Sequence, residues 1–150
     1  MIFDRTSKDV QNAKEIIETK VKTFSTLIDS ELEMLERGCF SISTLNRIEG
    51  AVEEIVQKMK DFGSLISAET KVWAIGDVFF ISDFNRILNN ILYLRSKIKV
   101  LPDTPNVPAP EFTYTALNSI EKILFDLKTL LENAEKSFVY SGEIYSGEVR

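Results

Sequence analysis

The side chains that most often carry out enzyme chemistry are scarce in this chain of 150 residues. It contains no histidine, so the commonest general base and the commonest metal ligand are both missing. Cys39 is the only cysteine, which excludes an internal disulfide, and no imidazole is present to activate its thiol. We expect Cys39 to be a small buried hydrophobic residue. The sequence therefore predicts no catalytic residue, no metal site and no bound cofactor.

Carboxylate chemistry is the class of catalysis that remains. Catalytic carboxylates need burial, or a like-charged partner in a cleft, to shift their pKa values. The clustered acidic residues are Glu31, Glu33 and Glu36, then Glu53 and Glu54, and then Glu132 and Glu135. All fall on predicted solvent faces among Lys and Arg, where pairing four residues apart is the ordinary role. We interpret them as surface charge, and an enzyme would require acidic side chains buried together in a cleft.

The composition is that of a globular protein with a mixed surface. The chain is 44% hydrophobic and 27% charged, and its net charge of -5 comes from 23 acidic and 18 basic residues. This balance offers no basic face to nucleic acid phosphates. The start of the chain lacks the apolar stretch of a signal peptide, and no run approaches the roughly 18 apolar residues that span a bilayer. We expect folding in a cytoplasm, with no membrane and no nucleic acid partner.

Helical periodicity dominates the sequence and predicts an all-α fold. Apolar residues at steps of three and four place one stripe on the first helix, made of Val10, Ala13, Ile17, Val21 and Phe24. A short helix is predicted over 30–37, with Leu32 and Leu35 facing inward. Three longer helices are predicted over 44–62, 83–98 and 116–137. We expect an antiparallel bundle of about five helices.

Two segments interrupt the helical pattern. Residues 64–81 mix aromatic and polar residues without a clean period, which predicts an ordered loop with Trp73 as a core anchor. A short strand at 71–75 or 78–81 is the alternative. Residues 101–112 hold all four prolines, so this connector must be extended.

Three of the predicted helices begin with the same pattern of residues. Its members are Ser43 and Asn46, Ser82 and Asn85, and Thr115 and Asn118. In one interpretation the hydroxyls cap their helices, and each Asn reaches back to the cap. In the other, the three Asn side chains occupy equivalent places in the bundle and bond to neighbouring backbone. The apolar ladders that follow are expected to be core: Leu45, Ile48, Val52 and Ile55; Phe84, Ile87, Ile91 and Leu94; Leu117, Ile120, Leu124 and Leu127.

The end of the chain repeats a five-residue unit, YSGEI followed by YSGEV. Aromatic and β-branched residues alternate there with Ser-Gly, a pattern that predicts an extended arm over 139–150 beyond a bundle domain over 1–138. Such an arm suits docking onto another chain, although a frayed terminus is the alternative. The predicted partner-binding residues are Tyr140, Glu143, Ile144, Tyr145, Glu148 and Val149.

The chain resembles a family of small helical structural proteins encoded in the tail and baseplate gene regions of Firmicutes bacteriophages and prophages. The resemblance spans nearly the whole chain. It is carried by residues 4–10 (DRTSKDV), 37–48 (RGCFSISTLNRI) and 140–149 (YSGEIYSGEV), with SDFNR at 82–86, the proline connector and LNSIE at 117–121 between them.

This resemblance implies a virion component made in the host bacterial cytoplasm, present in several copies near the tail tip, baseplate or fibre attachment. The expected partners are other tail proteins and copies of the chain itself, as a homo-oligomer within a larger assembly. The family supplies no catalytic residue. The alternative expectation is a tail-assembly chaperone, or a small acidic helical regulator, that is absent from the mature particle.

Overall fold

The computed structural model describes the backbone of residues 1–148 and the side chains of residues 1–137. This part of the chain is all-helical and contains no strand, including at 71–75 and 78–81. Its elements are α1 (Ser7–Ile16), a π-helical turn η1 (Ile17–Val21), α2 (Asp29–Gly38), α3 (Ile42–Asp61), α4 (Ile81–Lys97) and α5 (Tyr114–Glu148). The predicted all-α bundle is confirmed.

The core lies between α3, α4 and α5. All twelve residues of the three predicted apolar ladders are buried there, and Trp73 joins them with 3% of its surface exposed. Ladders that step by three and four keep one face of each helix toward its neighbours over the packed length. The burial of these large aliphatic side chains supplies the main stabilisation of the body.

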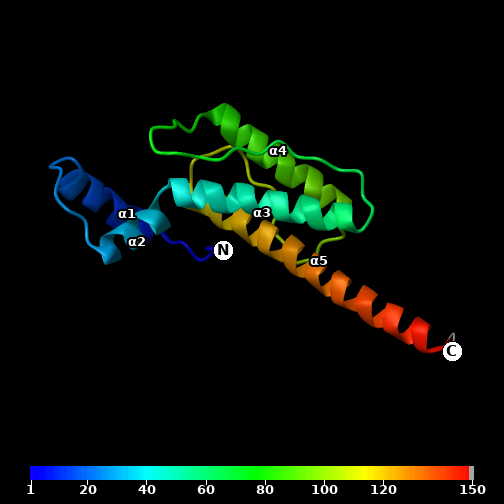
Figure 1. Ribbon diagram of the computed structural model, residues 1–150. Coiled ribbons are helices and arrows are strands. Elements are labelled where there is room, and N and C mark those ends of the chain that lie inside the picture. The colour runs from blue at the N-terminus through cyan, green and yellow to red at the C-terminus, as the bar shows by residue number, and fades with distance from the viewer. Residues whose placement is uncertain (149–150) are drawn as a thin grey trace.

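The three long helices run in the same direction, so the predicted antiparallel arrangement is wrong (Figure 1). Ion pairs record the register of α3 against α5: Arg47 with Glu121, Glu54 with Lys128, and Lys58 with Glu135. Both members of each pair advance together along the chain, which only parallel helices allow. Arg86 and Glu49 likewise join the starts of α4 and α3.

The lengths of the links explain how parallel helices are possible. The 20 residues of α3 rise about 30 Å, a distance that about ten extended residues can retrace. The links at 62–80 and 98–113 are both longer than that. Each link returns the chain to the starting end of the bundle, and the second contains the four prolines.

Two parts of the chain extend beyond this body (Figure 1). The pair α1–α2 forms a hairpin at the end where α3 begins, and α5 projects past the opposite end. Backbone of α5 is helical as far as Glu148, which corrects the extended arm predicted over 139–150. Gly142 and Gly147 each cost about 1 kcal/mol relative to alanine inside a helix, so this end of α5 is helical against local propensity.

Candidate interaction surfaces

The repeated helix starts do not serve as caps in the predicted way. The helices begin two residues earlier, so the predicted caps Ser43, Ser82 and Thr115 are exposed residues inside the first turn. The actual caps are Ser41, whose hydroxyl accepts from the Thr44 N–H, and Thr113, which accepts from the Ala116 N–H. In α4 the carboxylate of Asp83 accepts from the Phe80 N–H.

As a consequence, each repeated Asn is the fifth residue of its helix and lies too far along to reach the cap. Two of the three instead bond to the backbone of a neighbouring extended segment. The Asn46 amide donates to the Trp73 carbonyl at 3.0 Å and accepts from the Trp73 N–H at 2.7 Å. Asn118 forms the same pair with Arg5, at 2.9 Å and 3.0 Å. Asn85 is exposed and makes no hydrogen bond within the described chain.

A glutamate three residues after each of these two Asn completes the site. Glu49 accepts from the Trp73 indole N–H at 3.2 Å and from both terminal nitrogens of Arg86. Glu121 accepts from the Arg5 guanidinium at 2.7 Å. We call each arrangement, Asn46 with Glu49 and Asn118 with Glu121, an Asn–Glu clamp.

The Asn–Glu clamp on α5 is the more deeply buried of the two. The side chains of Arg5 and Glu121 are both fully buried, and Arg47 adds two further bonds to Glu121, at 2.8 and 3.1 Å. Burial by itself would raise the pKa of Glu121, but hydrogen bonds from Arg47, the Ile2 N–H and Arg5 outweigh it, so the pKa lies below its ordinary value. Glu36 bonds to Arg47 in turn, which balances two positive charges with two negative ones.

Three phenylalanines close the same end of the body. Phe40, Phe79 and Phe112 each stand six residues before a repeated Asn, and each precedes a helix cap. Their ring centroids are 5.5 to 5.6 Å apart, within the range of favourable aromatic pairs. The repeat is therefore longer than the pattern predicted from Ser or Thr to Ile, and sequence reasoning missed both its Phe and its Glu.

Replacing Asn118 tests what its clamp contributes. Asn118→Ala removes both bonds to the Arg5 backbone and should lower the free energy of unfolding by about 1–2 kcal/mol. Trypsin should also cut after Arg5 faster, because the N-terminal segment loses its anchor. The control is Asn89→Ala, since Asn89 is exposed and its side chain makes no hydrogen bond within the described residues; this variant should stay within about 0.5 kcal/mol of the unchanged protein. Equal cleavage rates in both variants would contradict an anchoring role for Asn118.

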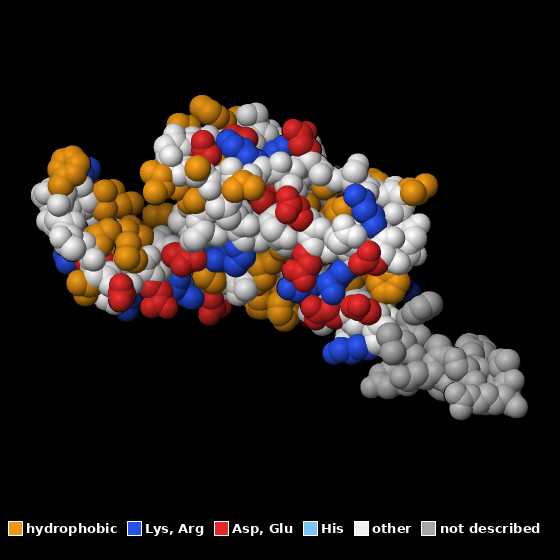
Figure 2. Space-filling view, in the orientation of Figure 1, with side chains coloured by type: hydrophobic (Ala, Val, Ile, Leu, Met, Phe, Trp, Pro, Cys, Tyr) orange, Lys and Arg blue, Asp and Glu red, His pale blue; other side chains and the backbone are white. Residues whose placement is uncertain are grey.

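The α1–α2 hairpin carries an exposed apolar surface. The apolar stripe predicted on the first helix is buried only at Ala13, so that prediction is largely wrong as a core face. On the second helix Leu32 is exposed, against the prediction, whereas Leu35 is partly buried. We define the hairpin tip by its exposed apolar residues: Ile17 at 37%, Val21 at 43%, Phe24 at 96%, Ile28 at 59% and Leu32 at 50%. Figure 2 shows hydrophobic side chains gathered over this end of the molecule.

Phe24 is held in an unusual backbone conformation at this tip. Its φ is 55°, in the left-handed region where a bulky side chain is disfavoured. Hydrogen bonds from Ser25 N–H to Lys20 and from Phe24 N–H to Val21 wrap the end of η1 around it. This position ordinarily favours glycine, and a phenylalanine exposed there suggests a contact outside the folded chain.

A close approach of backbone holds the hairpin together at its base. A Cβ on Gly38 would lie 2.3 Å from the Asp9 carbonyl oxygen and 2.4 Å from the Ala13 Cβ. Arg37 reinforces the contact by pairing with Asp9 and Asp4. The absence of a side chain at Gly38 thus allows α2 to end directly against α1.

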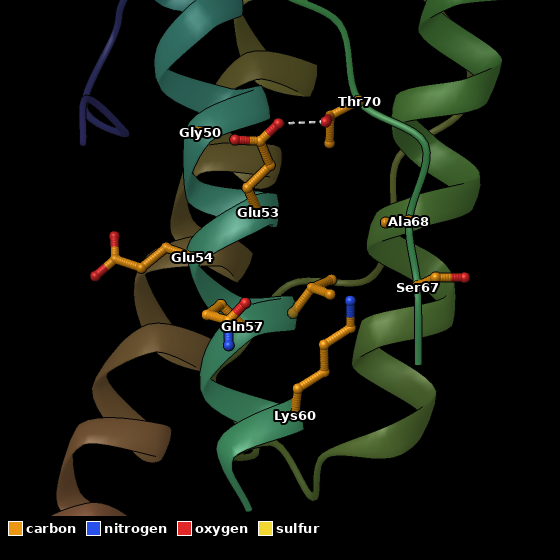
Figure 3. A pocket seen from close by; sticks show the side chains of 9 residues that line it. Gly50, Glu53, Glu54, Gln57, Lys60, Ser67, Ala68 and Thr70 are labelled. Atoms are coloured by element: carbon orange, nitrogen blue, oxygen red, sulfur yellow. Dashed lines mark hydrogen bonds between the residues drawn. The ribbon is translucent and has the colours of Figure 1, made fainter. Parts of the chain in front are cut away.

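An open groove of about 590 Å³ lies between α3 and the segment 67–70 (Figure 3). Glu53 accepts a hydrogen bond from Thr70 across it, and Lys60 extends into the space beside Ala68. Glu54 points away and pairs with Lys128. The groove therefore contains Lys60 and the carboxylate of Glu53, which is already hydrogen-bonded to Thr70.

The remaining predicted residues are placed as follows. Tyr140, Glu143, Ile144, Tyr145 and Glu148 belong to the projecting end of α5, and Val149 lies outside the described residues. Cys39 is half-buried, and burial raises the pKa of its thiol.

The predicted surface acids mostly form ion pairs, as Glu31 does with Lys20. The buried carboxylates Glu49 and Glu121 pair with arginines rather than with each other.

Residues 1–148 contain no helix with the length and apolar character of a membrane span. Among the side chains that the structure describes, those of residues 1–137, no group of three or more potential metal ligands comes together. Comparison of the chain with protein-family models, with curated proteins and with solved structures finds no match.

Proposed function

We propose that this chain is a structural protein of a bacteriophage tail or tail-like particle that works by binding neighbouring protein chains. The observation that carries the proposal is the hairpin tip, an apolar surface held away from the body on a rigid base. Exposed apolar patches of this kind mark protein interaction sites. The tail setting rests on the family resemblance and extends to the baseplate, tail tip or fibre attachment.

The body supports this role by fixing the direction of the tip. Arg5 bonds to the Arg37 carbonyl at the end of α2 while its guanidinium also bonds to Glu121 on α5. The hairpin is thereby joined to the body through a buried charge cluster. A rigid mount of this kind keeps the entropy cost of docking low.

Phe24→Gly tests the hairpin tip without harming the fold. Glycine accepts a φ of 55° without strain, so the free energy of unfolding should be unchanged or raised by up to about 1 kcal/mol. Incorporation into particles, measured by mass spectrometry of purified particles from complemented host cells, should fall at least about tenfold.

The matched control is Leu65→Gly. Leu65 is fully exposed on the link 62–80, away from the hairpin, and its loss should leave incorporation unchanged. Normal incorporation of the Phe24→Gly chain would contradict the role of the tip. If the unchanged chain is needed for assembly but is absent from finished particles, it is an assembly chaperone, which is the alternative function.

A further inference from the structure

The side chain of the third repeated Asn, unlike those of the other two, makes no hydrogen bond within the described residues. Asn85 is the fifth residue of α4, as Asn46 is of α3 and Asn118 is of α5. Each follows a buried residue of the apolar ladder directly and precedes a buried Ile by two. The three side chains therefore leave their helices at the same angle to the core.

The surface around Asn85 is free of charge. At 100° per residue, Ile81 and Leu92 lie within about 40° of Asn85 around the helix axis. These two side chains are 48% and 55% exposed, and the adjoining exposed residues Ser82 and Asn89 are uncharged. In a chain with 27% charged residues, an uncharged face along most of one helix is suited to burial.

The link before α5 is anchored elsewhere and is poorly equipped to pair with Asn85. Arg95 bonds to the Pro105 carbonyl, and Thr104 bonds to Asp126 on α5. Pro108 and Pro110 further along have no N–H to donate. Among the residues whose side chains the structure describes, 1–137, no backbone group therefore pairs with the Asn85 side chain.

We propose that Asn85 is a binding site for an extended segment of a partner protein. The carboxamide would accept from one backbone N–H and donate to the carbonyl of the same residue, as Asn46 does with Trp73. Charge complementarity specifies the side chain of that residue. In each Asn–Glu clamp, the glutamate three residues after the Asn accepts from a donor on the side chain of the bound residue. In α4 the residue three after Asn85 is Leu88, which carries no charge. The bound residue is therefore apolar and packs against Ile81 and Leu92.

The site can be tested with a library of random heptapeptides displayed on ribosome–mRNA complexes. Peptides selected on the whole protein, after removal of those that bind the Asn85→Ala variant, should have extended, β-branched sequences with a central apolar residue. Their binding, measured by calorimetry, should weaken about tenfold on Asn85→Ala, which corresponds to about 1.4 kcal/mol. Asn133→Ala, which replaces an exposed Asn on α5 outside this face, should bind like the unchanged protein.

Replacing single backbone amides of the selected peptide by esters identifies the paired N–H. One ester should weaken binding to the unchanged protein about fivefold to tenfold and have no effect on the Asn85→Ala variant. A library that yields no peptide sensitive to Asn85, or an ester effect that persists in the variant, would overturn the proposal. The hairpin tip is unchanged in all these proteins, so either outcome is independent of the result with Phe24→Gly.

Discussion

Glu121→Gln should lower the free energy of unfolding by about 3–5 kcal/mol at pH 7, because it removes the carboxylate that pairs with the fully buried Arg5. Glutamine retains the shape of glutamate but leaves Arg5 and Arg47 without their shared counter-charge. Urea denaturation followed by circular dichroism measures the change. Glu135→Gln is the control, since the pair that Glu135 makes with Lys58 lies at the surface and contributes less than about 1 kcal/mol.

Acid should reduce the difference in the free energy of unfolding between the unchanged protein and Glu121→Gln. The folded-state pKa of Glu121 lies below its ordinary value of 4.5, so the stabilisation from its charge is complete above about pH 4.5. It is lost as the pH falls through the folded-state pKa. Denaturation curves of the unchanged protein and Glu121→Gln should therefore converge as the pH falls below about 4.5 and then through the lower folded-state pKa. A loss below about 1 kcal/mol at pH 7 would show that the buried cluster is not a main source of stability.

Gly38→Ala is expected to separate the hairpin from its base. The added Cβ would overlap the Asp9 carbonyl oxygen, a backbone atom that cannot move without shifting α1. We expect a loss of about 1–3 kcal/mol, together with faster hydrogen exchange in α1 and α2 than in α3. Because the hairpin presents Phe24, particle incorporation should fall as well.

Gly50→Ala provides the matched control for this change. Gly50 lies within α3, and a Cβ there would meet no atom within 4 Å. Alanine has the higher helix propensity, so the control should be stabilised by up to about 1 kcal/mol. Hydrogen exchange in the hairpin that is equally slow in both variants would contradict the close contact at Gly38.

Local patterns of the sequence predict the helices well. Ladders such as Leu45, Ile48 and Val52 depend only on helical period and hydrophobicity, and every predicted member is buried. The predicted helix starts lie two residues after the observed ones. In α3 the reason is that Ser41 and Ser43 both satisfy the preference for a hydroxyl cap. The direction of the helices was beyond prediction, since a link as long as 62–80 can join either parallel or antiparallel neighbours.

The interaction surfaces depend on contacts between distant parts of the chain. Arg5 and Glu121 look like ordinary surface residues in the sequence, and because they lie 116 positions apart their burial together depends on how the chain between them folds. The stripe on α1 has the period of a core face, but its hairpin packs mainly on itself and leaves Phe24 exposed. Periodicity shows which side of a helix is apolar and cannot show whether the same chain covers it.

The separation between Arg5 and Glu121 also sets the order in which the molecule is completed during translation. Ribosomes add about 5–20 residues per second, so the 116 residues from Thr6 to Glu121 take on the order of ten seconds to synthesise once Arg5 has been added. During this interval Arg5 lacks its carboxylate partner, while the local contacts of the α1–α2 hairpin, including the bond from Arg5 to the Arg37 carbonyl, can already form. The hairpin tip can therefore form before the bond to Glu121 exists, and synthesis of α5 supplies the carboxylate that joins the hairpin to the body.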